Sequence, residues 1–215
     1  MFRTLRDMLL YKSGRDNEVD KAARFILATN GKSLDGTIEL WSETPTGQRY
    51  MAGERIIDFV KDYEDSDPST FATLYLAFKQ RTGYDALKNY YPESKPKSKS
   101  KAFSAFISDT HDFLHVVTGY PTDIPGELAR IRVFNGIEGR GWQLINVIMN
   151  LRYWFCWWKQ ERKLYWELQK EAAEQSKVIN NYMFMPWFDM LGWHVNKVRK
   201  NFNTLETTIH HWKNT

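Results

Sequence analysis

The hydrophobic and polar positions of most of the chain repeat with the period of an α-helix. Apolar residues recur three and four positions apart, the spacing of one helix face, and no stretch shows the strict alternation of a half-buried strand. This pattern covers segments 1–12, 17–29, 53–63, 68–78, 102–118, a segment that opens at 122–123, 141–168 and 167–182. It predicts an all-α fold.

Glycine and proline mark the expected breaks between these helices. Residues 31–50 are polar and contain several glycines and a proline, so we expect a loop there. Residues 92–101 carry four lysines and two prolines, which indicates a solvated loop. The sequence Gly119-Tyr120-Pro121 ends the preceding helix, and we expect Pro186 to end the last helix and to be followed by a short tail.

The composition is typical of a folded protein of a reducing compartment. The chain has 215 residues, 42% of them hydrophobic, which is enough for a sizeable core in a single domain. The one cysteine, Cys156, excludes an intramolecular disulfide and a cysteine-rich zinc module. We find neither an apolar run long enough to span a membrane nor an N-terminal secretory signal, and we expect a cytoplasmic protein.

The net charge and the aromatic content indicate which classes of partner this protein could bind. The net charge of +4 is too small to indicate a nucleic-acid partner by itself. Aromatic residues make up 15% of the chain. Such a content is typical either of a core rich in large rings or of a surface or tunnel that binds an apolar ligand.

One group of residues has the chemistry of a metal site. His111 and His115 are four residues apart, so on a helix they project from one face and can bind the same ion. Asp112 lies about 100° round the helix from His111, where it can be a ligand or can orient an imidazole. The alternative for the bare histidine pair is a helix surface with one hydrogen-bonded core histidine.

Glu127 can complete this site although it follows His115 by twelve residues. On a continuous helix the two would be roughly 18 Å apart, but the break at 119–121 lets the chain reverse and places Glu127 early in the next helix. Two imidazole nitrogens with one or two carboxylate oxygens suit zinc, iron, cobalt or manganese, and ligand type does not choose among them.

The spacing disfavours two classes of metal hydrolase. Zincin proteases carry a glutamate between the two histidines, where this chain has the shorter Asp112. HD phosphohydrolases use a further upstream histidine, and no histidine precedes residue 111. A hydrolase of an unrelated soluble substrate is therefore the weakest of the functional hypotheses.

The segment from Asp109 to Ala129 resembles the signature of the coenzyme Q biosynthesis protein 4 family. That family carries HDxxH, eleven further residues and a glutamate, with a hydrophobic residue, Thr and Gly after the second histidine. Weaker similarity extends over residues 50–205, at Glu54-Arg55-Ile56, Thr70-Phe71 through Phe78, Pro186-Trp187 and Val198-Arg199. The chain departs from the family pattern at Ala72, Phe134 and the lysine-rich loop 93–101.

The resemblance implies an all-α protein that binds one divalent metal ion, zinc being the first choice, through His111, Asp112, His115 and Glu127. It also implies a peripheral membrane protein of ubiquinone biosynthesis that acts beside other proteins of that pathway. Members have been regarded as scaffolds of the biosynthetic complex, and also as enzymes that oxidatively remove the ring carboxylate of a polyprenylated precursor. The sequence does not separate these two roles.

A polyprenyl chain would need a long apolar groove. The aromatic run 142–158 supplies a candidate wall formed by Trp142, Ile145, Ile148, Met149, Phe155 and Trp158. The same side chains could equally form a buried core helix, and exposed members could contact a bilayer or a second copy of the chain in a homodimer. Arg130, Arg132 and Arg140 could bind a carboxylate or phosphate head group, and the alternative for them is solvation at the surface.

Overall fold

The structure is a computed structural model that describes residues 35–63, 67–82, 96–138, 147, 151 and 159–204. These residues form helices and no β-strand, with one isolated bridge between Thr70 and His194, so the predicted all-α fold is confirmed. The chain divides into two compact units, 1–35 with 123–177 and 36–122 with 178–215. The expectation of a single domain is not tested and stays a prediction.

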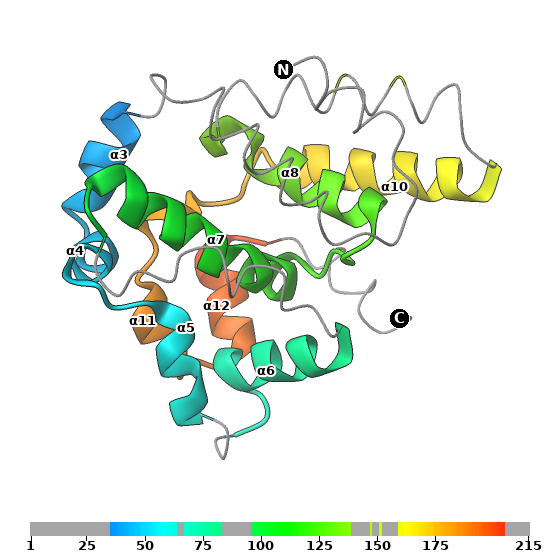
Figure 1. The fold of residues 1–215 in the computed structure, drawn as a ribbon. Coiled ribbons are helices and arrows are strands. Elements are labelled where there is room, and N and C mark those ends of the chain that lie inside the picture. The colour runs from blue at the N-terminus through cyan, green and yellow to red at the C-terminus, as the bar shows by residue number, and fades with distance from the viewer. Residues whose placement is uncertain are drawn as a thin grey trace. The chain divides into compact units, whose positions relative to one another are not determined.

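The second unit is built around the long helix α7 (Lys99–Thr118), as Figure 1 shows. Its other elements are α3 (Asp35–Ser42), α4 (Pro45–Ala52), α5 (Ile56–Phe59), the 3₁₀ helix η1 (Val60–Tyr63), α6 (Phe71–Thr82), the 3₁₀ helix η2 (Tyr182–Phe184), α11 (Trp187–Met190) and α12 (Val195–Phe202). Helices α4, α5, α6 and α12 all contact α7. The predicted histidine pair therefore lies on the central helix of this unit.

Aromatic rings fill the core of the second unit. Phe106 and Phe113 of α7 pack against Trp187, with ring centroids 6.3 and 5.9 Å apart. Tyr75 of α6 stacks on Phe113 at 3.9 Å, and the indole N–H of Trp187 donates to the Tyr182 carbonyl at 2.8 Å. Of the two interpretations of the aromatic content, a ring-rich core holds for this unit.

The expectation of a loop over residues 31–50 was wrong, since α3 and α4 lie there. Thr44 caps α4, because its side-chain oxygen accepts the Gly47 N–H at 3.0 Å, and Pro45 occupies the first turn, where an N–H is not needed. At Gly47 an added Cβ would lie 2.1 Å from the Trp41 carbonyl oxygen. Pro45 and Gly47, which suggested a loop, instead lie in the first turn of α4, and Gly47 allows α4 to pack closely against Trp41 of α3.

The expectation of a short tail after Pro186 was also wrong, because the helices α11 and α12 follow this proline. Backbone hydrogen bonds tie this segment to the start of α6: the Val195 N–H donates to the Ser69 carbonyl at 3.0 Å, and the Phe71 N–H donates to the Trp193 carbonyl at 2.8 Å. Helices this short have little stability of their own. Contacts between segments far apart in sequence therefore decide where they form.

The first unit contains α8 (Ile124–Glu138) and α10 (Lys159–Gln175), which pack against each other. Helix α8 begins as predicted, because the Asp123 carboxylate accepts the Gly126 N–H at 2.8 Å. Arg132 of α8 donates to the side-chain oxygen of Gln169 on α10 at 3.3 Å. Helix α10 runs through the boundary between the segments expected over 141–168 and 167–182 and ends before residue 182, so one helix lies where the pattern predicted the end of one and the start of another.

Several expectations concern residues outside the described part of the chain. They are the amphipathic segments 1–12 and 17–29 and the candidate groove formed by Trp142, Ile145, Ile148, Met149, Phe155 and Trp158. These stay predictions. Within the described ranges, no helix has both the length and the apolar character needed to cross a membrane.

Candidate metal centre

The caps of α7 define the helix that carries the histidine pair. Ser98 begins it with a side-chain oxygen that accepts the Lys101 N–H at 3.3 Å, and Gly119 ends it in the left-handed conformation with φ of 75°. Between these caps His111 and His115 lie one turn apart, with ring centroids separated by 5.2 Å. The two imidazoles therefore share a helix face, as their spacing predicted.

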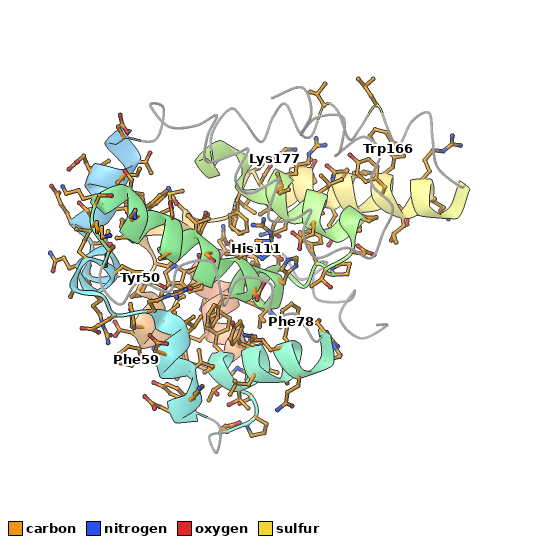
Figure 2. All side chains as sticks on the ribbon, viewed as in Figure 1. Tyr50, Phe59, Phe78, His111, Trp166 and Lys177 are labelled. Atoms are coloured by element: carbon orange, nitrogen blue, oxygen red, sulfur yellow. The ribbon has the colours of Figure 1, made fainter. Side chains whose placement is uncertain are left out.

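The imidazole of His115 is buried and held by two neighbours. Its Nδ1 lies 3.0 Å from the Tyr120 carbonyl oxygen, and the ring of Phe78 stacks on it at 5.9 Å (Phe78 is labelled in Figure 2). Because a carbonyl oxygen can only accept a hydrogen bond, Nδ1 carries the hydrogen. With the hydrogen on Nδ1, Nε2 is the nitrogen that would bind a metal ion.

Asp112 supports the second imidazole. Its Oδ1 lies 3.0 Å from Nδ1 of His111, and Asp112 itself is buried. A carboxylate oxygen accepts a hydrogen bond, so Nδ1 of His111 is also the donor, and Nε2 is the nitrogen that would bind a metal ion. Of the two roles that the sequence allowed for Asp112, this contact favours the orienting one, while direct ligation by Asp112 stays a prediction.

A buried polar network for which no role was predicted surrounds Asp109, two residues before His111. Asp109 accepts hydrogen bonds from the Tyr50 hydroxyl at 2.9 Å and from Arg55 Nε at 3.0 Å, and Arg55 Nη2 makes a further short contact. Burial and the charge of Asp109 raise the pKa of Tyr50 well above its ordinary value, which keeps this hydroxyl a donor. Burial lowers the pKa of Arg55, but Asp109 outweighs it, so that pKa is raised.

The last turn of α7 is also held from α12. Arg199 donates from Nη2 to the Val116 carbonyl at 3.1 Å and from Nε to the Val117 carbonyl at 3.4 Å. Burial lowers the pKa of Arg199 from its ordinary value, but a guanidinium remains charged at any physiological pH. The resemblance at Val198-Arg199 was the one sequence signal that pointed to this residue.

Glu127 lies in the first turn of α8, as predicted. Its backbone N–H donates to the Asp123 carbonyl at 2.8 Å, and its Oε2 lies 3.4 Å from Nε of Arg130. Arg130 is buried, and its guanidinium places a positive charge beside the Glu127 carboxylate. Arg130 thus has a partner in its own helix, whereas the sequence suggested only a ligand head group or solvent.

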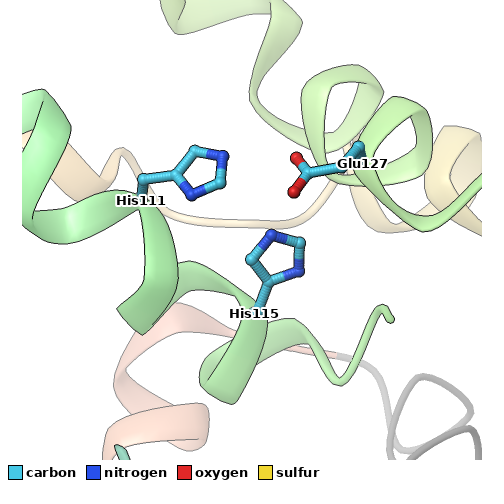
Figure 3. A group of neighbouring side chains, drawn as sticks. All are labelled: His111, His115 and Glu127. Atoms are coloured by element: carbon cyan, nitrogen blue, oxygen red, sulfur yellow. The ribbon is translucent and has the colours of Figure 1, made fainter. Parts of the chain in front are cut away.

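Two imidazoles and one carboxylate form the donor set. His111, His115 and Glu127, drawn on their helices in Figure 3, could hold a metal ion, and they are the one such group among the described residues. Two nitrogens and one oxygen donor, with further positions for water or substrate, suit the divalent ions of the zinc and iron group. Both histidines have their Nδ1 hydrogen bonded to an acceptor, the usual arrangement for metal-binding histidines.

These features define a class of protein: an all-α chain with a candidate metal site formed by HDxxH on one helix and a glutamate on the next. Residues 28–207 match the family described as coenzyme Q (ubiquinone) biosynthesis protein Coq4. The chain belongs to this family, as its resemblance at residues 109–129 implied, and thus to a group of coenzyme Q biosynthesis proteins.

Comparison with known structures supports the fold. The chain is similar to a protein from Nostoc punctiforme, provisionally named a ubiquinone biosynthesis protein, with a TM-score of 0.67 and 14% sequence identity over 94% of this chain and 95% of the other. At this identity the likeness establishes the fold alone. Among curated proteins, none matches the chain.

Proposed function

We propose that this protein binds one divalent metal ion through His111, His115 and Glu127 and acts on a polyprenylated ring precursor of ubiquinone. The observation that carries the proposal is the orientation of His115. Its Nδ1 hydrogen is held by a backbone carbonyl, which is the usual arrangement of a metal-binding imidazole, and in this orientation Nε2 is the nitrogen that would bind the ion.

The connection between the two helices favours a shared ion. Helix α7 ends at Thr118 and α8 begins at Ile124, so five residues connect them. A connection of this length keeps the helix ends within about 20 Å of each other even when fully extended. The break at Gly119-Tyr120-Pro121 lets the chain reverse within this connection, so Glu127, in the first turn of α8, can approach the pair. The Arg130 Nε lies 3.4 Å from Oε2 of Glu127.

Zinc is the first choice for the ion, and iron, cobalt and manganese suit the same donors. When bound, the ion would act as a Lewis acid that polarises a carboxylate or phenolate oxygen of the substrate. In the enzymatic form of the proposal the ring carbon would lose its carboxylate as carbon dioxide and gain a hydroxyl oxygen from water, while dioxygen would accept the two electrons and two protons and become hydrogen peroxide. The residues of the chain orient the imidazoles, through Asp112 and Tyr120, and exclude water around His115.

The partners that we propose follow from this substrate. The prenyl chain would occupy the groove predicted at residues 142–158, and the protein would act at the membrane surface beside other proteins of quinone biosynthesis. The alternative is a prenyl-lipid-binding scaffold in which the metal is structural. Both roles need the same site, and turnover separates them.

The test is metal content and turnover of the purified protein. We expect close to one zinc per chain by elemental mass spectrometry, lost in His115→Ala and Glu127→Gln. The matched control is His194→Asn, which removes an imidazole outside the site while asparagine keeps the helix-capping acceptor of α12. Carbon dioxide release from a prenylated 4-hydroxybenzoate in air would establish the enzyme. Zinc and co-purified prenyl lipid without turnover would identify the scaffold, and no metal after reconstitution would end the proposal.

A further inference from the structure

Most of the backbone carbonyl groups in the last turn of α7 accept a hydrogen bond from an identified donor. The last four carbonyls of an α-helix have no partner within the regular ladder and must find others. Here the His115 carbonyl accepts the N–H of Gly119 at 2.8 Å, and the next two carbonyls, of Val116 and Val117, accept the guanidinium of Arg199. A side chain from α12 thus completes the end of a helix about 80 positions earlier in the chain.

Arginine is suited to this position because of its shape. Its Nε and Nη2 hydrogens lie in one plane and point in neighbouring directions, so a single side chain can reach two successive carbonyls. A positive charge at a helix C-terminus also interacts favourably with the helix dipole. A lysine ammonium carries the charge, but it cannot present the same planar pair of donors.

The turn that Arg199 holds is the turn that orients His115. The acceptor of the His115 Nδ1 hydrogen is the carbonyl of Tyr120, which follows directly after the cap residue Gly119. The position of that carbonyl relative to the imidazole therefore depends on the conformation of the cap. His111 differs, because its Nδ1 partner is the adjacent residue Asp112 on the same helix.

We propose that Arg199 is a positioning residue of the metal site: from α12 it fixes the C-terminal turn of α7, and through the Tyr120 carbonyl it fixes the proton and orientation of the His115 imidazole. The inference rests on the metal-binding function proposed above. It adds a specific arginine, distant in sequence and outside the ligand set, to the residues that determine metal affinity.

The position of α12 supports this role. Its start is tied to the segment before α6 by the bond from the Val195 N–H to the Ser69 carbonyl at 3.0 Å, and its end packs on Trp187 through Phe202, with ring centroids 5.5 Å apart. Arg199 projects from a helix that is anchored at both ends. A donor on an anchored helix can hold a cap in place, whereas one on a loose segment would move with it.

The experiment compares zinc affinity with stability in the full chain. Arg199→Met removes both donors but keeps the aliphatic stem, and Arg199→Lys keeps the charge. Phe202→Leu is the stability control, because it weakens the packing of α12 without changing a donor to α7, and Lys200→Met is the control for loss of an exposed charge on α12. Zinc dissociation constants come from chelator competition, and melting temperatures from circular dichroism.

We expect Arg199→Met to weaken zinc binding about tenfold, the lower end of the effect of a support that orients a ligand. Arg199→Lys should be intermediate. Phe202→Leu should lower the melting temperature while changing zinc affinity less than twofold, and Lys200→Met should change neither. Unchanged affinity in Arg199→Met, or an equal loss in Phe202→Leu, would overturn the inference.

A second readout needs no metal. In the metal-free protein, nitrogen-15 spectra of the histidine side chains report which ring nitrogen carries the hydrogen. We expect His115 to hold it on Nδ1 in the wild type and to become a mixture of tautomers in Arg199→Met, while His111 is unchanged. If the wild type binds no zinc, the proposed function fails, and the His115 tautomer still decides the inference. If Arg199→Met does not fold, Arg199→Lys supplies both readouts.

Discussion

At the scale of single residues, one carboxylate organises the buried polar groups beside the histidine pair. Asp109 accepts hydrogen bonds from Tyr50 and Arg55, which come from α4 and from the residue before α5. Asp109 and Arg55 lie in segments that resemble the family, but no role was predicted for any of the three residues, because an aspartate in a helical pattern is usually on the solvent side. Their partners are more than fifty residues away, so only the folded chain brings the three together.

Removing the charge of Asp109 tests this network. We expect Asp109→Asn to lower the free energy of unfolding by about 3 kcal/mol, because it removes the carboxylate that neutralises a mostly buried guanidinium. Urea titration followed by circular dichroism measures the loss. Asp189→Asn, at an exposed position of α11, should change stability by less than about 0.5 kcal/mol. Equal effects of the two would contradict the assignment.

The raised pKa of Tyr50 predicts a specific loss of stability in alkali. Since the folded state holds this proton more tightly than the unfolded chain, the stabilisation is complete below about pH 10 and is lost as the pH rises toward the folded pKa. One such group adds a slope of up to about 1.4 kcal/mol per pH unit. Tyr50→Phe should therefore lose less stability than the wild type between pH 9.5 and 11 in urea titrations, and parallel curves would refute the prediction.

At the scale of elements, local sequence signals predicted the two long helices of the site, α7 and α8, but did not predict the short helices. Helix α7 has its caps and its apolar face in its own sequence, although it begins at Lys99, inside the segment 92–101 that was expected to be a loop. Helices α3, α4, α11 and α12 have four to eight residues each, and glycine or proline lies inside or directly before three of them. Helices of that length form where tertiary contacts hold them.

Two glycines of neighbouring helices provide a matched test of whether close tertiary contacts hold the short helices. At Gly47 a Cβ would collide with the backbone of Trp41, whereas at Gly36, in the first turn of α3, it would meet nothing within 4 Å. We expect Gly47→Ala to destabilise the protein by more than about 2 kcal/mol, since backbone must move. Gly36→Ala should be neutral or stabilise by about 0.5 kcal/mol, because alanine is the better helix former. Melting temperatures of the two variants decide, and similar values would count against the close contact.

At the scale of the whole molecule, a bound ion would couple metal binding to the stability of the folded chain. His111 and His115 lie on α7, and Glu127 lies on α8. Any ligand that binds the folded state alone raises its stability in proportion to the logarithm of its concentration. Metal dependence of the melting temperature is thus a measure of the proposed site that does not require substrate.

Zinc should raise the melting temperature of the wild type and a chelator should reverse the rise. At a free zinc concentration of one hundred times the dissociation constant, the gain is about 2.7 kcal/mol. Glu127→Gln should reduce this gain, because a neutral amide is a poorer zinc ligand than a carboxylate. Glu167→Gln, at an exposed position of α10, should keep it in full. A melting temperature of the wild type that does not depend on zinc would contradict the proposed metal site.

The sequence by itself determined the helical class, the face shared by His111 and His115 and the place of Glu127 at the start of the next helix. All three follow from residue spacing and from one Gly-Tyr-Pro break, which are local properties of the chain. Only the tertiary structure decided which nitrogen of the His115 ring carries the hydrogen and which short helices form. The acceptor of His115 is a backbone carbonyl beyond the helix cap, and the donor that holds that cap comes from α12, so no local pattern could have placed either.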